Sequence, residues 1–107
     1  MEEIVSMAQW VRVASLAEIP PGSAKEVQAA DRIVALYNVE GTVHALDGIC
    51  PHQGGPLGQG LLDGRVVTCP WHGWQFDVTT GQHRVSCQIQ QERIPVRVDG
   101  DDVFVSI

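Results

Sequence analysis

Residues 48–60 read Gly-Ile-Cys-Pro-His-Gln-Gly-Gly-Pro-Leu-Gly-Gln-Gly, and residues 69–74 read Cys-Pro-Trp-His-Gly-Trp. Each stretch contains one cysteine and one histidine, which are Cys50 and His52 in the first and Cys69 and His72 in the second. Five glycines and two prolines in the first stretch indicate a loop whose backbone approaches another group closely. Two thiolates and two imidazoles in matched loops predict a four-ligand metal site.

Most of the remaining chain reads as short strands separated by turn-forming residues. Strands are expected at residues 10–13, 24–28, 33–39, 42–46, 61–62, 66–68, 74–77, 94–98 and 103–107. Glu40-Gly41 and Asp63-Gly64 are hairpin signals, and the second hairpin would bring the two Cys/His loops side by side. Ser15–Ile19 is at most one helical turn, and Pro95 places its strand at an edge or at a strand start. The pattern predicts an all-β fold built as a sandwich of antiparallel sheets.

Composition limits the classes of function. A chain of 107 residues is expected to form one domain over residues 1–107. The net charge of −6 argues against a nucleic-acid partner, because phosphate binding needs clustered Lys and Arg. No apolar run is long enough to cross a membrane. The acidic start Met1-Glu2-Glu3 is unlike a secretory signal, so we expect a cytoplasmic protein.

Three cysteines, Cys50, Cys69 and Cys87, are an odd number for a disulfide framework. They instead indicate metal binding with Cys87 as a spare thiol. His44 and His83 are expected to be structural or surface residues, because His44 lies in an expected strand and His83 beside the turn at Gly81. The sequence contains no nucleophile motif, no dinucleotide fingerprint and no paired carboxylates in a plausible pocket, so we expect no catalytic residues.

Two metal centres are compatible with the four candidate ligands. A structural zinc site usually takes ligands from C-x(2–4)-C and H-x(3–5)-H pairs, whereas each loop here mixes one cysteine with one histidine. In a [2Fe–2S] cluster of mixed ligation, two cysteines bind one iron and two histidines bind the other. Mixed loops suit the cluster better, and zinc stays open on ligand chemistry alone.

The stretches Cys50–Leu57 and Cys69–Trp74 resemble the two boxes of the Rieske [2Fe–2S] family, and the specific part of the resemblance covers residues 50–76. It implies a Rieske-like sandwich of antiparallel sheets with a small two-loop cluster-binding subdomain at about 48–76. It also implies one Rieske [2Fe–2S] cluster per chain. Cys50 and Cys69 would hold the iron that stays ferric, and His52 and His72 the iron that accepts the electron.

The sequence departs from the respiratory type of that family. The respiratory type carries two further cysteines that join the loops by a disulfide, and those positions are Gly55 and Trp71 here. Its serine after the second His-Gly, a hydrogen-bond donor to sulfur, is Trp74 here. With fewer donors around the sulfurs we expect a reduction potential at the low end of the Rieske range, roughly −150 mV.

The boxes look most like those of Rieske ferredoxins, the soluble components of bacterial aromatic-ring dioxygenase systems. That resemblance implies a one-electron carrier, not an enzyme, which takes electrons from a flavoprotein reductase and passes them to a terminal oxygenase. The alternatives are the small Rieske-like subunit of an assimilatory nitrite reductase and a structural zinc or regulatory module. The presence of all four ligands favours the ferredoxin, because some members of the nitrite reductase group lack them.

Overall fold

The computed structural model describes residues 9–51, 54–71, 73–86 and 88–107. His52, Gln53, His72 and Cys87 therefore lie outside the described residues, as do residues 1–8. The described strands are β1 (Trp10–Ser15), β2 (Ala24–Ala29), β3 (Arg32–Val39), β4 (Thr42–Asp47), β5 (Leu61–Asp63), β6 (Val66–Thr68), β7 (Gln75–Asp77), β8 (Arg93–Ile94), β9 (Val96–Asp99) and β10 (Asp102–Ser106). Two single 3-10 turns, η2 (Leu16–Glu18) and η3 (Leu57–Gln59), complete the described elements.

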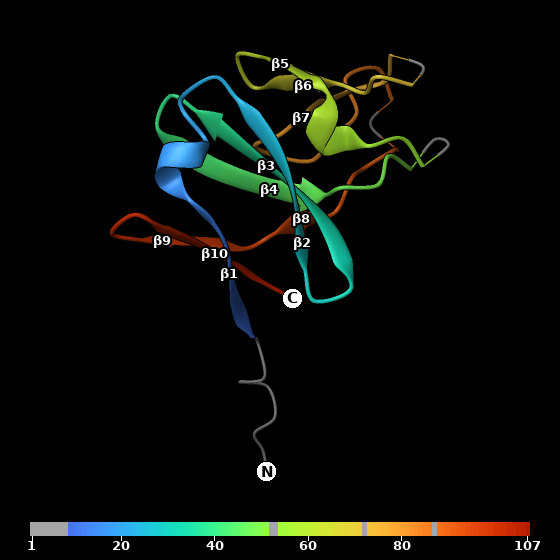
Figure 1. The fold of residues 1–107 in the computed structure, drawn as a ribbon. Coiled ribbons are helices and arrows are strands. Elements are labelled where there is room, and N and C mark those ends of the chain that lie inside the picture. The colour runs from blue at the N-terminus through green and yellow to red at the C-terminus, as the bar shows by residue number, and fades with distance from the viewer. Residues whose placement is uncertain (1–8, 52–53, 72, 87) are drawn as a thin grey trace.

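The strands form three antiparallel sheets stacked in layers (Figure 1). The central sheet has the order β2-β3-β4-β8, the outer sheet β1-β10-β9, and the small sheet β5-β6-β7. In Figure 1 the small sheet lies above the central sheet and the outer sheet lies below it. The loops that follow β4 and β6 extend to the same end of the molecule. The expected all-β sandwich is confirmed. None of the helices in the described ranges has the length and apolarity needed to span a membrane.

Both predicted hairpins form, but only the first has its turn at the predicted residues. In the first, Val39 pairs with Thr42, and the central residues Glu40 and Gly41 have φ angles of 53° and 97°. Two positive φ angles in a two-residue loop match the right-handed twist of the strands. In the second, Asp63 already pairs with Val66, so the turn lies one residue later than the Asp-Gly signal suggests.

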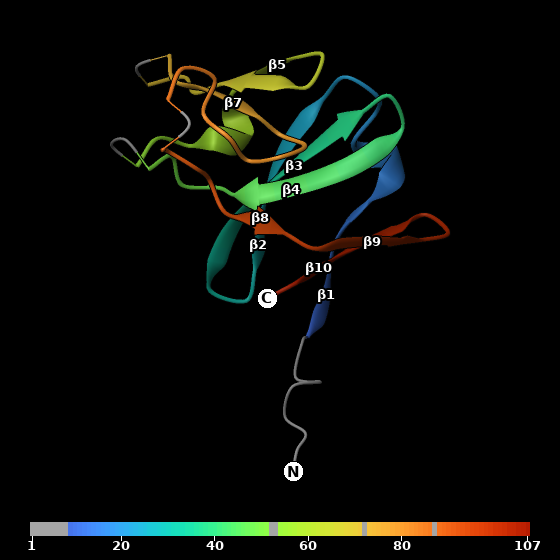
Figure 2. The ribbon, with the colours of Figure 1, turned by 180° about the vertical axis from the view of Figure 1, so that it is seen from behind.

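The strand expected over residues 94–98 is two strands, because Pro95 divides it. Proline has no backbone N–H and cannot donate a ladder hydrogen bond. β8 pairs with β4 in the central sheet, whereas β9 pairs with β10 in the outer sheet. The Pro95 carbonyl accepts a hydrogen bond of 3.1 Å from the Ser106 N–H as the chain changes sheets (Figure 2).

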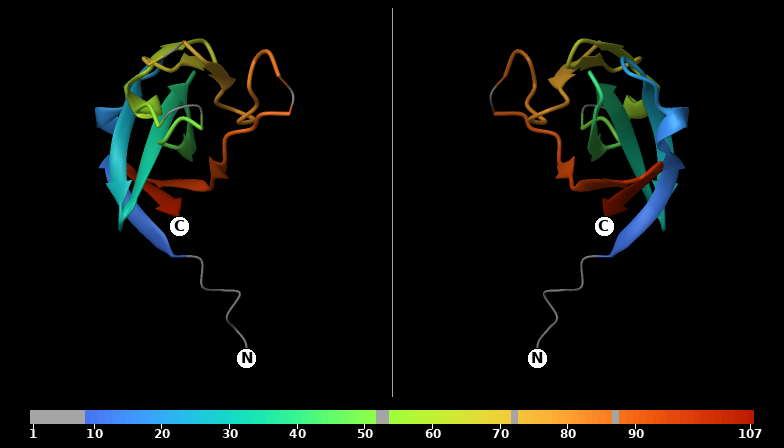
Figure 3. Two further views of the ribbon diagram at one scale, coloured as in Figure 1. Left: turned by 90° about the vertical axis from the view of Figure 1, so that its right-hand side faces the viewer. Right: turned by 90° about the vertical axis from the view of Figure 1, so that its left-hand side faces the viewer.

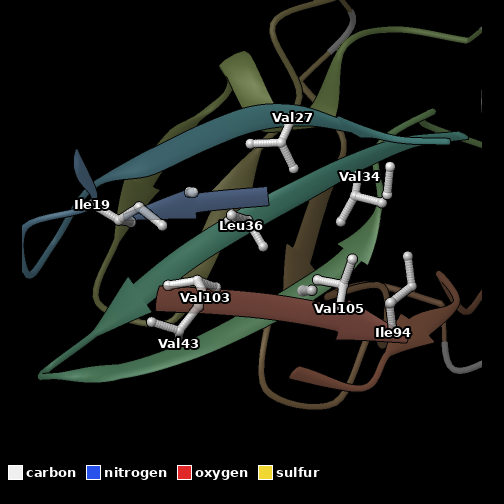
Figure 4. Packing of buried hydrophobic residues seen from close by; sticks show 11 residues of the cluster. Ile19, Val27, Val34, Leu36, Val43, Ile94, Val103 and Val105 are labelled. Carbon is white, nitrogen blue, oxygen red and sulfur yellow. The ribbon is translucent and has the colours of Figure 1, made fainter. Parts of the chain in front are cut away.

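Alternate residues of β3 contribute to two different cores, one on each face of the central sheet. Val34 and Leu36 face the outer sheet, and Ala35 and Tyr37 face the small sheet. Figure 4 shows the first core, in which side chains of β2, β3 and β4 meet those of β8 and β10. Its buried members are Ala14, Ile19, Val27, Ala29, Val34, Leu36, Val43, Ala45, Ile94, Val103 and Val105.

The second core carries the two cysteines of the expected site. It lies between the central and small sheets, and its buried residues are Ala35, Tyr37, Leu46, Cys50, Leu57, Val67, Cys69, Phe76 and Val78. Cys50 and Cys69 are only 2% and 3% exposed. The fold thus places two thiols, nineteen positions apart in the sequence, in one apolar setting.

Candidate metal centre

The first cysteine loop is closed by two backbone hydrogen bonds. The Cys50 N–H donates to the Gly55 carbonyl at 2.9 Å, and the Gly54 N–H donates to the Cys50 carbonyl at 2.9 Å. Gly54 has a φ of +78°, in the left-handed region, where a residue with a Cβ atom would cost about 1–2 kcal/mol. Glycine at position 54 therefore lets the chain reverse immediately after the cysteine.

The second cysteine loop repeats this geometry. The Cys69 N–H donates to the Trp74 carbonyl at 2.7 Å, and the Gly73 N–H donates to the Cys69 carbonyl at 3.1 Å. Gly73 has a φ of +75°, close to that of its counterpart in the first loop. The two loops are therefore equivalent in backbone structure, although the sequence places the histidine two residues after Cys50 and three residues after Cys69.

The two loops touch each other at Gly55. A Cβ atom added at Gly55 would lie 2.8 Å from the Sγ of Cys69 and 3.0 Å from the Cγ of Trp71. Both separations are far below van der Waals contact, so only glycine fits at this position. Positions 55 and 71, which carry the inter-loop disulfide in the respiratory type, are thus neighbours, and the Trp71 side chain lies where a side chain at position 55 would have to go.

Hydrogen bonds attach the first loop to the central sheet. The Gly48 N–H donates to the Ile33 carbonyl, and the Leu57 N–H donates to the Gly48 carbonyl, both at 3.0 Å. The buried Tyr37 hydroxyl donates to the Leu57 carbonyl at 2.8 Å. Burial, together with the negative charge of the Cys69 and Cys50 thiolates, raises the pKa of Tyr37 well above its ordinary value. Tyr37 therefore stays a neutral donor.

Gln91 holds the same loop from its other side, a role that no motif in the sequence indicates. Its side chain is 5% exposed, and its Nε2 donates to the carbonyls of Asp47 and Ile49, each at 2.7 Å. Asp47 lies three residues before Cys50, and Ile49 lies one residue before it. A glutamine in a polar loop normally points into solvent, so only the three-dimensional structure identifies this contact.

His83 lies beside the second loop, as a structural residue. Its Nδ1 accepts hydrogen bonds of 3.1 Å from the N–H groups of Val85 and Ser86. Its ring is edge-on to the rings of Trp74, with a centroid distance of 4.8 Å, and Phe76, at 5.2 Å. Because Nδ1 is an acceptor, the ring proton is assigned to Nε2. That nitrogen is buried and has no hydrogen-bond partner among the described residues.

His44 is half-buried on β4, directly opposite Tyr37 in the ladder with β3. Burial lowers the pKa of His44, the nearby positive charge of Arg93 lowers it further, and Asp77 partly offsets the two. It is therefore neutral near pH 7. This is consistent with the structural role expected for it.

The donor set fits an iron–sulfur cluster of mixed ligation. Cys50 and Cys69 are soft donors, buried in an apolar core and brought together by equivalent loops. His52 and His72 lie outside the described residues, so the structure does not place them. Among the residues it does describe, no group of three or more potential metal ligands occurs. Within those limits, the structure brings together the half of the predicted site that it describes.

Comparison with known proteins points to one family. A family model described as the Rieske [2Fe–2S] domain matches residues 9–103. The ferredoxin component of the naphthalene 1,2-dioxygenase system of Pseudomonas aeruginosa is 35% identical over 102 residues, which cover 92% of this chain and 96% of that protein. A chain in the solved complex of reduced oxygenase and oxidized ferredoxin in carbazole 1,9a-dioxygenase is 31% identical, with a TM-score of 0.83. That match covers 91% of this chain and 92% of the other.

A solved putative nitrite reductase small subunit also superposes, with a TM-score of 0.76 over 91% of this chain and 97% of that one. Its identity to this chain is 20%, which shows a common fold alone.

The contact at Gly55 leads to a first prediction. Gly55→Ala should force the Cys69 sulfur and Trp71 away, because the new methyl group has no space, and overpacking of this kind costs about 1–3 kcal/mol. Labelling of the Cys69 thiol by a maleimide in metal-free protein should become faster. Gly41→Ala is the control, since a Cβ there meets nothing within 4 Å and strains only a turn. Equal labelling rates in the two variants would contradict the contact.

The lowered pKa of His44 leads to a second prediction. Unfolded His44 titrates near 6.5 and folded His44 below it, so between these values the unfolded chain binds more protons. The free energy of unfolding should therefore fall as pH drops through 6.5 toward the folded pKa. His44→Gln has no imidazole to titrate. Its free energy of unfolding, measured by urea, should therefore fall less between pH 7 and pH 5 than that of the wild type. Parallel pH profiles would count against the burial of His44.

Proposed function

This chain belongs to the Rieske [2Fe–2S] family, and on that premise we propose that Cys50, His52, Cys69 and His72 hold its cluster. Membership of the family implies one Rieske-type [2Fe–2S] cluster per chain. The observation that carries the assignment is the contact of the two equivalent cysteine loops, with Gly55 against the Cys69 sulfur. The sequence supplies one histidine per loop next to these cysteines.

The four residues divide by chemistry. Cys50 and Cys69 supply negative thiolates that hold a ferric iron, and burial of both sulfurs keeps water away from that side. His52 and His72 supply neutral imidazoles for the other iron, which favours its reduced form. When bound, the cluster stores and releases one electron. Trp74 stands directly after His72-Gly73, where the respiratory type has a hydroxyl donor, which is why we assign the low-potential type.

The function supported best is that of a ferredoxin, an electron carrier without a catalytic site of its own. The relatives that align over nearly their whole length are named as ferredoxin components of dioxygenase systems. We assign the chain the same position, between a flavoprotein reductase that supplies electrons and a terminal, aromatic-ring-hydroxylating oxygenase that receives them. The carbazole dioxygenase complex, in which an oxygenase and a ferredoxin are bound to each other, supports a direct transfer.

The end of the molecule that carries the loops suits docking of a redox partner. Residues 48–60, 66–76 and 85–91 contain no Asp, Glu, Lys or Arg, although the chain has a net charge of −6. Ile49 and Trp71 are 45% and 52% exposed there. Docking at this end therefore depends on apolar contact more than on charge, and long-range electrostatic steering by the acidic residues makes a small contribution.

The proposal extends to organisation and location. The chain acts as a single Rieske domain over residues 1–107, in which residues of about 48–76 form the cluster-binding subdomain. The two cores on either side of the central sheet support this division. Because a flavoprotein reductase of this kind draws electrons from NAD(P)H, the proposed location is the cytoplasm. The nitrite reductase alternative has the weaker support of a shared fold at 20% identity.

The ligand assignment predicts how the potential responds to substitution. His52→Cys or His72→Cys should retain part of the cluster and lower its midpoint potential, because a thiolate adds negative charge to the iron that is reduced. The shift should be toward the roughly −400 mV of plant-type four-cysteine ferredoxins. His44→Cys is the control, since His44 lies on β4 and outside both loops. A redox titration that gives the wild-type potential for a His52 or His72 variant would contradict the assignment.

The carrier role is tested with purified partners. With an NADH-dependent flavoprotein reductase and a dioxygenase oxygenase component, the holo-protein should be required for product formation. Trp71→Ala should raise the concentration needed for half-maximal rate, because it removes an exposed apolar group at the docking end. Trp10→Ala is the control, since Trp10 is 39% exposed on β1 of the outer sheet. Formation of a stable complex with a sirohaem-containing subunit, with no transfer to any oxygenase, would refute the role.

A further inference from the structure

The segment that follows β7 connects the two cysteine loops without a covalent bond. We call residues 81–86 and 88–91 the strap, and Figure 3 shows it in orange beside β7 and running back to β8. One part of it contacts the chain that leads out of the second loop. Another part contacts the chain that leads into the first loop. Hydrogen bonds within the strap connect these two groups of contacts.

The first anchor of the strap is Gln91. Its amide donates both of its hydrogens to main-chain carbonyls at the base of the first loop, at 2.7 Å each. Because Gln91 is only 5% exposed, these bonds are shielded from water. Removing the amide would leave two buried carbonyls unpaired, at a cost of about 1–3 kcal/mol for each such group. The next residue extends the contact, since the Glu92 carbonyl accepts from the Asp47 N–H at 2.9 Å.

The second anchor is His83. Its imidazole packs edge-on against Trp74 of the second loop and Phe76 of β7. The backbone on either side pairs with β7, because the Arg84 N–H donates to the Gln75 carbonyl and the Asp77 N–H donates to the Gln82 carbonyl, both at 2.9 Å. Nδ1 of the same imidazole accepts from two N–H groups and so fixes the bend that follows. His83 thus joins the strap to the second loop.

Hydrogen bonds within the strap join the two anchors. The Gln91 N–H donates to the Gly81 carbonyl at 2.6 Å, and the His83 N–H donates to the Ile89 carbonyl at 3.1 Å. Gln82 and Gln90 form a β-bridge between these two bonds. The anchors are therefore held in one small antiparallel unit, and a displacement at one anchor moves the other.

We propose that the strap is a non-covalent tie that holds the two cysteine loops in fixed relation, with Gln91 and His83 as its positioning residues. The proposal rests on the proposed function in so far as the loops hold the cluster. The tie has a mechanical role like that of an inter-loop disulfide in a chain whose positions 55 and 71 are glycine and tryptophan. It keeps both loops close-packed around the sulfurs, so that electron transfer requires little rearrangement of the chain.

The test measures whether a change at one loop is felt at the other. In holo-protein, Gln91→Leu should accelerate amide hydrogen exchange about tenfold or more in peptides covering residues 47–57. It should also accelerate exchange in peptides covering residues 69–77, although both side-chain hydrogen bonds of Gln91 go to Asp47 and Ile49 at the first loop. His83→Phe keeps an aromatic ring but loses the Nδ1 acceptor. It should accelerate exchange in residues 69–77, next to the substitution, and also in residues 47–57 of the first loop. Exchange in residues 96–107 of the outer sheet should stay unchanged in both variants.

A double-variant cycle provides a second readout. Release of the cluster to a chelator, followed by visible absorbance, should be faster in each single variant. The double variant should be little faster than either, because detaching one end already disables the tie. Gln88→Leu is the matched control, since Gln88 is an exposed glutamine of the same strap and its substitution should leave both readouts at the wild-type value. Should Gln91→Leu fail to fold, Gln91→Asn keeps an amide on a shorter side chain and carries the same expectation.

Two results would overturn the tie. In the first, each substitution accelerates amide exchange only in the loop that it contacts. In the second, the effects of the two substitutions on the rate of cluster release add in the double variant. The exchange readout does not need a cluster. If the wild-type chain bound none, the ligand assignment would fall while exchange alone still decided whether the strap couples the two loops. If the cluster is bound and exchange is uncoupled, the ferredoxin role stands and the tie is wrong.

Discussion

The close contact between Gly55 and the Cys69 sulfur is the constraint on which the rest of the site depends. It requires two loops of equivalent backbone structure to meet without a side chain between them, which is why a glycine must occupy position 55. The meeting is possible because each loop reverses at a glycine with positive φ four residues after its cysteine. The Tyr37 hydroxyl and the Gln91 amide fix the first loop in its place by hydrogen bonds to carbonyls on either side of it.

The central sheet allows one small chain to combine a stable scaffold with a closely constrained site. β3 sends alternate side chains into two cores, so the outer sheet stabilises the fold while the small sheet is free to carry the loops. The break at Pro95 contributes to this separation of the two cores. Before it, β8 pairs with β4 in the central sheet, and after it, β9 pairs with β10 in the outer sheet. Formal charges are excluded from the loop stretches, which leaves an apolar end for a redox partner.

Much of this could be predicted from the sequence, for identifiable physical reasons. The strands, the two hairpins and the paired Cys/His loops follow from local signals, namely alternation, Gly-containing turns and ligand spacing. The division at Pro95 could not, because the choice of sheet on either side depends on distant strands. Nor could the role of Gln91 be found, since its burial is created by carbonyls more than forty residues earlier in the chain. His52 and His72 stay predictions, because they lie outside the described residues.

A single cluster held by two thiolates and two imidazoles has a distinctive spectroscopic signature. Pulsed EPR hyperfine spectroscopy of the reduced protein, prepared with ¹⁵N-labelled histidine, measures this directly. With two imidazole ligands we expect strong couplings to two histidine nitrogens in the wild type and to one in His72→Cys. A reduced cluster without strongly coupled histidine nitrogen, or a protein that binds zinc and gives no EPR signal, would contradict it.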